Sequence, residues 1–403
     1  MRRLFSLRNP RLFIAGQWLS TFGDSTLWIA AAIWVKVLTH SNAAAGLTFF
    51  FMALPSLGAP LAGIVVDRVR RKPLLIAINA LTGGAVLLLF LVRQPSEVWL
   101  IWVVMVLYGV SNVLLGPAQS ALLTVVVPDD LLADANGALQ TVAQGLRLIT
   151  PLAGAGLFAW LGGGAVASLD AATFGIAVVS LVLVRANEPA PHHEDSRWLE
   201  TVSAGARHLW RTLELRQLTI SGGLVMCVIG LFETIGFAVT AQGLHRPATF
   251  VGVLVAVQGV GALIGAPTAA PVIGRIGELR VAAVGMLAVA GGALLYTAPS
   301  LPVVLLGSIC LGLGLPWIVV GAYTLAQRRT PGALQGRVFS AFDVTLGTPQ
   351  TVSIALGAAV IAVVPYQALL VLSAFVIAAS GVWLVTRRRI PVPVAADGAG
   401  GEV

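Results

Sequence analysis

Charged residues are scarce in this chain: only 10% of its 403 residues are Asp, Glu, Lys or Arg, whereas 57% are hydrophobic. A soluble domain carries about 25% charged residues to cover its surface, so the composition excludes an ordinary water-soluble protein. Lipid is the solvent that suits it. Because a membrane-spanning helix needs about 20 apolar residues, the length accommodates roughly twelve spans and leaves no room for a separate catalytic domain.

Cysteine is nearly absent as well. Cys227 and Cys310 both lie in apolar stretches, where a thiol is a small hydrophobic side chain rather than part of a disulfide or metal site. His192 and His193 are adjacent but have no further ligands nearby, which indicates a solvated linker. The chain also lacks a Gly-x-x-x-x-Gly-Lys nucleotide-binding loop. We therefore predict no enzyme, no ATP-driven pump, no cofactor, no metal and no nucleic-acid partner.

Long apolar runs dominate what is present. They are continuously apolar and far longer than the alternating segments of about 10 residues in a membrane barrel, so they predict helices. The expected spans are residues 11–38, 43–66, 73–93, 97–126, 134–160, 165–185, 216–242, 248–273, 280–297, 301–326, 335–363 and 366–386. The first run is as long as a full span and has no small-residue cleavage site, which favours a retained helix over a signal peptide.

The positions of the Lys and Arg residues predict the orientation. Of the 25 such residues, 21 fall before the first span, after the last or in the even-numbered connections, whereas Lys36, Arg93 and Arg246 lie at the other side. Arg147 alone lies within a span. Positive charges collect on the cytoplasmic side, so we expect both termini in the cytoplasm of a bacterium and the chain in its inner membrane.

The two halves of the chain repeat a sequence pattern. Gly58 to Arg68 (GAPLAGIVVDR) aligns without gaps with Gly265 to Arg275 (GAPTAAPVIGR), each between the second and third spans of its half. A six-plus-six duplication follows, and parallel repeats of this kind place a substrate site between the halves near the bilayer midplane. The predicted units are a bundle at 1–185, a cytoplasmic linker with an amphipathic helix at 186–215, a second bundle at 216–386 and a cytoplasmic tail at 387–403.

The loop from Gly63 to Lys72 (GIVVDRVRRK) resembles the signature between spans two and three of the major facilitator superfamily. Together with Asn9-Pro-x-Phe and Gly23-Asp24, it is similar to the drug-exporter branch that includes macrolide-efflux and enterobactin-exporter proteins. The same branch also contains a lysophospholipid transporter. The resemblance implies an all-α membrane fold of twelve helices in two pseudo-symmetric six-helix bundles, which work by alternating access.

The resemblance also implies a cytoplasmic gate. Asp67 would meet the positive N-terminal end of span eleven near Arg337, and Arg68 and Arg71 would engage Asp129 or Asp130. The other interpretation is a solvated positive-inside loop, which we favour for Arg70 and Lys72. The candidate gate residues are Gly63, Asp67, Arg68, Arg71, Asp129, Asp130 and Arg337.

Ionisable groups inside the membrane are candidate functional residues because burying them is costly. Counting 1.5 Å per residue places Asp24 past the centre of span one and Glu233 in the outer half of span seven, the repeat-equivalent helix. Either or both are predicted to couple export to inward proton flow. The alternative for each is a structural carboxylate bonded to a neighbour such as Gln17 or Ser25.

Three further charges lie inside the spans. Arg147 and Asp170 lie at matching depths on the antiparallel fifth and sixth helices, which predicts an ion pair between them. Contact of Arg147 with an anionic substrate is the other possibility. Asp343 lies near the inner surface, where it either serves the gate or reaches headgroup water.

The leading functional hypothesis is a monomeric, proton-driven exporter of small hydrophobic or amphiphilic molecules, with protons and membrane lipid as its other partners. A second hypothesis is a lipid translocator of the same fold, in which Arg147 meets a phosphate. A third, a membrane sensor that transports nothing, is disfavoured because the chain offers no soluble output domain.

Overall fold

The computed structural model describes residues 2–59, 65–66, 68–186, 188, 206–330 and 334–386. Nearly all of these residues are helical, and none of them forms a strand. Large apolar side chains remain exposed on many helices; Leu81, Trp160 and Phe375 are 75%, 89% and 71% exposed. Such surfaces suit lipid rather than water. The all-helical membrane class predicted from the apolar runs is confirmed.

The first half begins with a short helix that leads into a long one. Ser41 marks the start of α3, because its hydroxyl accepts a hydrogen bond of 3.2 Å from the Ala44 N–H. The elements are α1 (Arg2–Ser6), α2 (Arg8–Thr39), α3 (Asn42–Ala53), η1 (Leu54–Gly58), α5 (Arg71–Leu87), η2 (Leu88–Leu91), η3 (Pro95–Glu97), α6 (Val98–Val126), η4 (Asp129–Leu131) and α7 (Leu132–Leu183).

The second half follows the linker, of which residues 206–211 are described and helical. Within this helix Leu209 is buried and Trp210 is half exposed. His192, His193 and most of the predicted amphipathic helix lie outside the described residues. The elements are α9 (Leu213–Ile229), α10 (Phe232–Ala238), η5 (Val239–Gly243), η6 (Ala248–Phe250), α11 (Val251–Ile276), α12 (Glu278–Leu295), α13 (Leu301–Arg329), α14 (Gln335–Val360) and α15 (Tyr366–Thr386).

The number of crossings agrees with twelve. Eight helices of the described chain are long and apolar enough to cross a membrane, and Asn42–Gly58 is a shorter apolar helix. The element α7 consists of two helices that join at Gly162, where φ is 78°, a conformation that favours glycine. Counting α7 as two helices and adding α2, α14 and Asn42–Gly58 gives twelve, consistent with the predicted spans.

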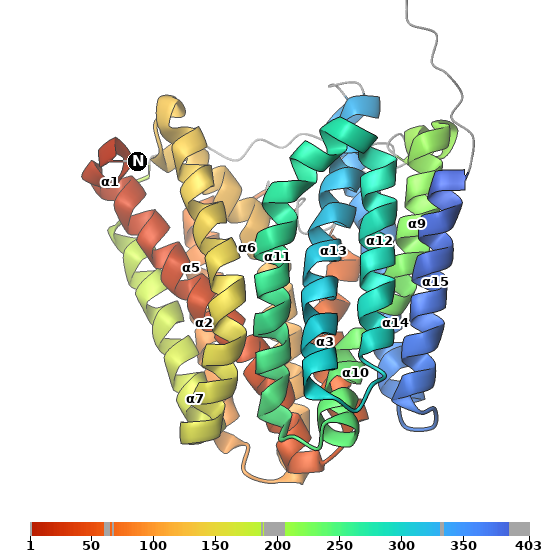
Figure 1. Cartoon of the computed structure of the whole chain (residues 1–403). Coiled ribbons are helices and arrows are strands. Elements are labelled where there is room, and N and C mark those ends of the chain that lie inside the picture. Colours follow the sequence, from red (N-terminus) through yellow and green to blue (C-terminus); the bar gives the residue numbers. More distant parts are fainter. Residues whose placement is uncertain are drawn as a thin grey trace, which may run out of the picture.

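The two ends of the helical chain lie at the same face of the bundle (Figure 1), as an even number of crossings requires. We call this the terminal face, because α1 and the end of α15 lie there, and the other side the opposite face. Which face is cytoplasmic stays a prediction from the charge distribution.

Each half has buried apolar clusters of its own at the terminal face. One cluster, which includes Ile14 and Leu122, contains only first-half residues. Another, which includes Leu218 and Phe342, contains only second-half residues. The exact division of the chain into two bundles and a linker stays a prediction.

Near the opposite face, by contrast, one buried cluster joins the halves. We call it the seal, and it consists of Ile29, Ala32, Ile33, Ala45, Phe49, Ala155, Phe237, Val251 and Ile354. At its centre the ring of Phe49 on α3 stacks on that of Phe237 on α10, with centroids 6.3 Å apart, and Trp28 of α2 packs against Phe49 at 5.4 Å. The halves therefore hold together through apolar side chains on this side.

Glycines allow the backbones of the two halves to approach at the seal. A Cβ atom on Gly46 of α3 would lie 2.0 Å from the Thr234 hydroxyl of α10. A Cβ atom on Gly252 of α11 would lie 2.7 Å from the Pro151 carbonyl oxygen of α7. A larger residue at Gly252 would meet the backbone of α7, and one at Gly46 would require the Thr234 side chain to move.

Candidate functional site

Asp24 lies on α2 inside the first half, where its carboxylate accepts a hydrogen bond of 2.5 Å from the hydroxyl of Tyr108 on α6. Its side chain is partly exposed. The predicted neighbours Gln17 and Ser25 are not its recorded partners. The tyrosine ring is fixed by Phe174 of α7, which meets it edge-on at 5.9 Å.

Asp170 of α7 lies beside the same point of α2. Its side chain is 0% exposed, and neither carboxyl oxygen has a hydrogen-bond partner. A Cβ atom on Gly23 would lie 2.6 Å from one Asp170 oxygen and 2.1 Å from the Thr173 hydroxyl. Only glycine at position 23 therefore lets α7 bring a second carboxyl group next to Asp24.

The side chain of Arg147 lies outside the described part of the structure, although its backbone belongs to α7. Its predicted ion pair with Asp170 therefore stays a prediction. Among the described side chains, those of Asp24 and Tyr108 lie close enough to Asp170 to interact with it electrostatically.

Glu233 lies in the first turn of α10, in the second half. It is partly buried and has no hydrogen bond or ion pair to another described residue. It is the neighbour in sequence of Thr234, which packs against Gly46 in the seal. The structure thus places Glu233 beside the contact between the halves, and does not join it to the group around Asp24.

Asp343 of α14 is exposed and accepts a 2.6 Å hydrogen bond from the hydroxyl of Tyr323 on α13. The Tyr323 ring stacks on Phe339 with centroids 5.6 Å apart and packs edge-on against Phe342 at 5.8 Å. This carboxylate therefore has a fixed partner near the terminal face.

The predicted gate is only partly visible. Gly63 and Asp67 lie outside the described residues, as do the side chains of Asp129 and Arg337. Arg68 is exposed and Arg71 is partly buried. Asp130 forms its ion pair with Arg3 at 2.7 Å rather than with either loop arginine, because α1 lies beside the start of α7.

The side chain of Lys72, which we expected to be solvated, instead links the start of α5 to the end of α7. Its ammonium group donates hydrogen bonds to the carbonyl oxygens of Val182 (3.2 Å) and Val184 (2.7 Å) at the end of α7, where a helix dipole favours a cation. The Glu188 carboxylate accepts from the backbone N–H groups of Arg71 (2.6 Å) and Lys72 (2.8 Å), which start α5.

The Asn-Pro start of α2 joins the same corner. Asn9 donates a 2.8 Å hydrogen bond to the Arg185 carbonyl oxygen and accepts one of 3.2 Å from the Arg185 N–H. The starts of α2 and α5 and the end of α7 are thus pinned to one another at the terminal face.

Tyr108 is the site residue that the sequence reasoning missed. A signal was present: the chain has only four tyrosines, and this one lies within the apolar run Val98–Val126. A buried tyrosine hydroxyl in a lipid environment needs a hydrogen-bond partner, and the nearest candidates by chemistry are the intramembrane carboxylates.

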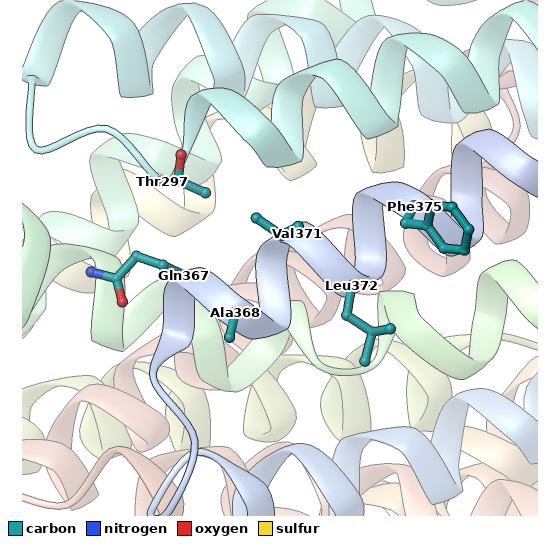
Figure 2. A pocket seen from close by; sticks show the side chains of 6 residues that line it. All are labelled: Thr297, Gln367, Ala368, Val371, Leu372 and Phe375. Atoms are coloured by element: carbon teal, nitrogen blue, oxygen red, sulfur yellow. The ribbon is translucent and has the colours of Figure 1, made fainter.

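A large apolar groove lies elsewhere on the molecule. Figure 2 shows it beside α15, where Thr297 follows α12 and Gln367, Val371 and Phe375 line the wall. Its volume is about 570 Å³, and its lining is almost wholly apolar. With no carboxylate among its lining residues, it contains none of the candidate coupling groups.

Comparison with known families agrees with this architecture. A sequence model of the Major Facilitator Superfamily matches residues 13–244 and, again, residues 218–401. The chain belongs to the Major Facilitator Superfamily. The resemblance seen in the Gly63–Lys72 loop is confirmed. The family and the long apolar helices indicate a multi-pass membrane protein with a transporter fold.

Individual relatives are more distant. Macrolide efflux protein A of Streptococcus pyogenes is 23% identical over 219 residues, so the match spans about half of each protein, 53% of this chain and 54% of the relative. Among solved structures, a bacterial homologue of the iron transporter ferroportin in its inward-facing state has a TM-score of 0.74 at 15% identity, covering 93% of this chain and 97% of its own. The nucleoside transporter NupG has a TM-score of 0.71 at 13% identity, covering 93% and 100%.

Proposed function

We propose that this superfamily member exports small hydrophobic or amphiphilic molecules across a bacterial inner membrane in exchange for protons. Both termini face the cytoplasm in this proposal, so the terminal face is the inner one and the protein works as a monomer. The similarity to a macrolide-efflux protein supports the direction and the substrate class.

The observation that carries the proposal is the position of Asp24. Its carboxylate lies among the helices of a lipid-embedded bundle, held by the Tyr108 hydroxyl and by no described cation. Intramembrane carboxylates of this kind are costly to keep, and they serve proton relays in pumps and transporters. Glu233, similarly unpaired beside the seal, is the corresponding group of the second half.

The arrangement of the seal supports alternating access. With the terminal face inside, the seal closes the outer side, while the buried clusters at the inner side each belong to one half. Proton binding and substrate release would accompany opening of the seal and closing of the inner gate. Asp67, Arg68, Asp130 and Arg337 stay candidate residues for that gate.

Transport by reconstituted protein tests the proposal. The probe is radiolabelled erythromycin in proteoliposomes with an imposed pH gradient, and the variants are Asp24→Asn and Glu233→Gln. We expect each variant to lose at least about tenfold in gradient-driven uptake, because the neutral side chain cannot exchange a proton. Asp195→Asn, the same chemical change in the polar linker, is the matched control.

Wild-type rates of concentrative uptake in the double variant would contradict the assignment of the coupling groups. Equal erythromycin movement with and without the pH gradient would contradict the exchange of protons. Gradient-independent movement of a lysophospholipid by the wild-type protein would favour a lipid translocator instead.

A further inference from the structure

The proposed function assigns no role to Asp170. Its side chain is completely buried, and both of its oxygens lack hydrogen-bond partners, although a carboxylate has about four lone-pair sites to satisfy. An ionised carboxylate that is completely buried, with no cation of the described chain paired with it, is strongly disfavoured. Asp170 therefore requires either a proton or a bound cation.

The groups that surround Asp170 favour a bound proton over a bound cation. From α2 comes Asp24, and from α6 comes Tyr108, which lies close enough to interact with both carboxyl groups. Thr173 of α7 donates its hydroxyl at 2.7 Å to the backbone carbonyl of Asp170 rather than to the carboxyl group. No Lys, Arg or His of the described chain forms an ion pair with either aspartate.

A metal ion fits this set poorly. Within the described ranges, no group of three or more His, Cys, Asp or Glu side chains could hold a metal. The space is also small, since oxygen atoms of Asp170 and Thr173 lie within 2.6 Å of the point where a Gly23 Cβ atom would be. Two carboxyl groups this close in a dry environment do not both ionise, and sharing one proton removes the repulsion.

We propose that Asp24, Tyr108 and Asp170 form one proton-binding site, in which the two carboxyl groups hold a single proton and the Tyr108 hydroxyl determines which of them is ionised. In the structure the hydroxyl donates to Asp24, so Asp24 is the ionised partner and Asp170 carries the proton. The inference rests on the proposed proton coupling and adds the residue on which the proton is held.

Transfer within the site is balanced. Once Asp170 moves into hydrogen-bond contact with Tyr108, it gives its proton to the phenolic oxygen while the phenolic proton passes to Asp24, and the hydroxyl then points to Asp170. One proton has moved from the sealed carboxyl group to the partly exposed one, and the phenol is unchanged. Asp24 is thus the exchange group and Asp170 the store, with Tyr108 as a positioning residue.

Infrared spectroscopy of the protein in lipid nanodiscs tests this without substrate or gradient. The Glu233→Gln background removes the carboxyl group beside the seal, which could give a similar band. We expect a carbonyl stretching band of a protonated carboxyl group at neutral pH that exchanges slowly in D₂O. Asp170→Asn abolishes the band. Tyr108→Phe keeps it but changes its frequency and moves its midpoint pH by about one unit, a tenfold change in proton affinity.

The control is Glu278→Gln, which removes a carboxylate that is ion-paired with Arg328 at the terminal face and leaves the band unchanged. Absence of the band in the Glu233→Gln background, or its persistence in Asp170→Asn, overturns the proposal. If Asp170→Asn does not fold, Tyr108→Phe decides, and an unaltered frequency and midpoint overturn it. Loss of coupling by Asp24→Asn in proteoliposomes is a separate result, so failure of the storage site and failure of proton coupling are distinguishable.

Discussion

At the residue scale, Gly23 is the position on which the carboxyl pair depends. A Cβ atom there would lie 2.1 Å from the Thr173 hydroxyl and 2.6 Å from Asp170, far inside van der Waals contact. We expect Gly23→Ala to destabilise the protein by about 1–3 kcal/mol, the usual cost of overpacking. The measurement is thermal unfolding in detergent.

Gly84 of α5 provides the matched control for this substitution. Nothing lies within 4 Å of the point where its Cβ atom would be, and it occupies the same half of the molecule. Gly84→Ala should leave the free energy of unfolding unchanged or raise it by up to about 1 kcal/mol, because alanine favours a helix. The unfolding midpoint should then stay the same or rise slightly. Equal destabilisation by both alanines would mean that α2 and α7 are not closely packed at Gly23.

At this scale, some features of the candidate site could be predicted from the sequence and others could not. The placement of Asp24 and Glu233 among apolar helices could be predicted because a carboxylate in an apolar run is conspicuous. The closeness of Tyr108 to Asp170 could not, because counting residues fixes the depth along a helix but not the direction in which a side chain points around it.

At the element scale, the end of α7 depends on a lysine from another helix. Lys72 bridges the start of α5 to the carbonyl oxygens of Val182 and Val184. We expect Lys72→Met, which keeps the aliphatic stem but loses the donors and charge, to decrease stability by about 1 kcal/mol. The unfolding midpoint in detergent measures it.

Arg70 is the neighbouring cation that suits as the control, since it is exposed and its side chain has no hydrogen bond or ion pair to another described residue. Arg70→Met should leave the midpoint unchanged. Similar losses from both substitutions would show that overall positive charge at this face, rather than the specific helix-end contact, provides the stability.

The helices themselves were largely predictable, because long apolar runs have one stable form in lipid. The eleventh span, expected at 335–363, is found at Gln335–Val360. The break between the fifth and sixth spans, expected between residues 160 and 165, is found at Gly162, where the backbone leaves the helical conformation. The chain reverses there: Gly154 and Thr173, on the two sides of Gly162, both pack against α2, near Thr26 and Gly23.

At the scale of the whole molecule, the two faces differ in how the halves meet. At the opposite face, the seal unites them through stacked phenylalanines and close backbone approaches at Gly46 and Gly252. At the terminal face, the ion pairs of the described chain stay within one half, such as Arg329 with Glu214 at 2.6 Å. A rocking motion that opened the seal would therefore separate apolar surfaces and leave the pinned helix ends intact.

A cross-link through the seal tests whether that separation is part of transport. The Cβ position of Gly46 lies 3.0 Å from the Thr234 Cβ atom, slightly below the 3.5–4.5 Å or so that a disulfide spans, so a small shift suffices. In a background lacking Cys227 and Cys310, the pair Gly46→Cys and Thr234→Cys should form a disulfide on oxidation. We expect oxidised protein to lose erythromycin transport in proteoliposomes and reduction to restore it, because the link holds both halves together at the face that must open.

Each single cysteine, treated identically, shows the effect of the substitution itself. Undiminished transport by fully cross-linked protein would mean that the substrate leaves without the seal opening, and alternating access between the two halves would then be the wrong description.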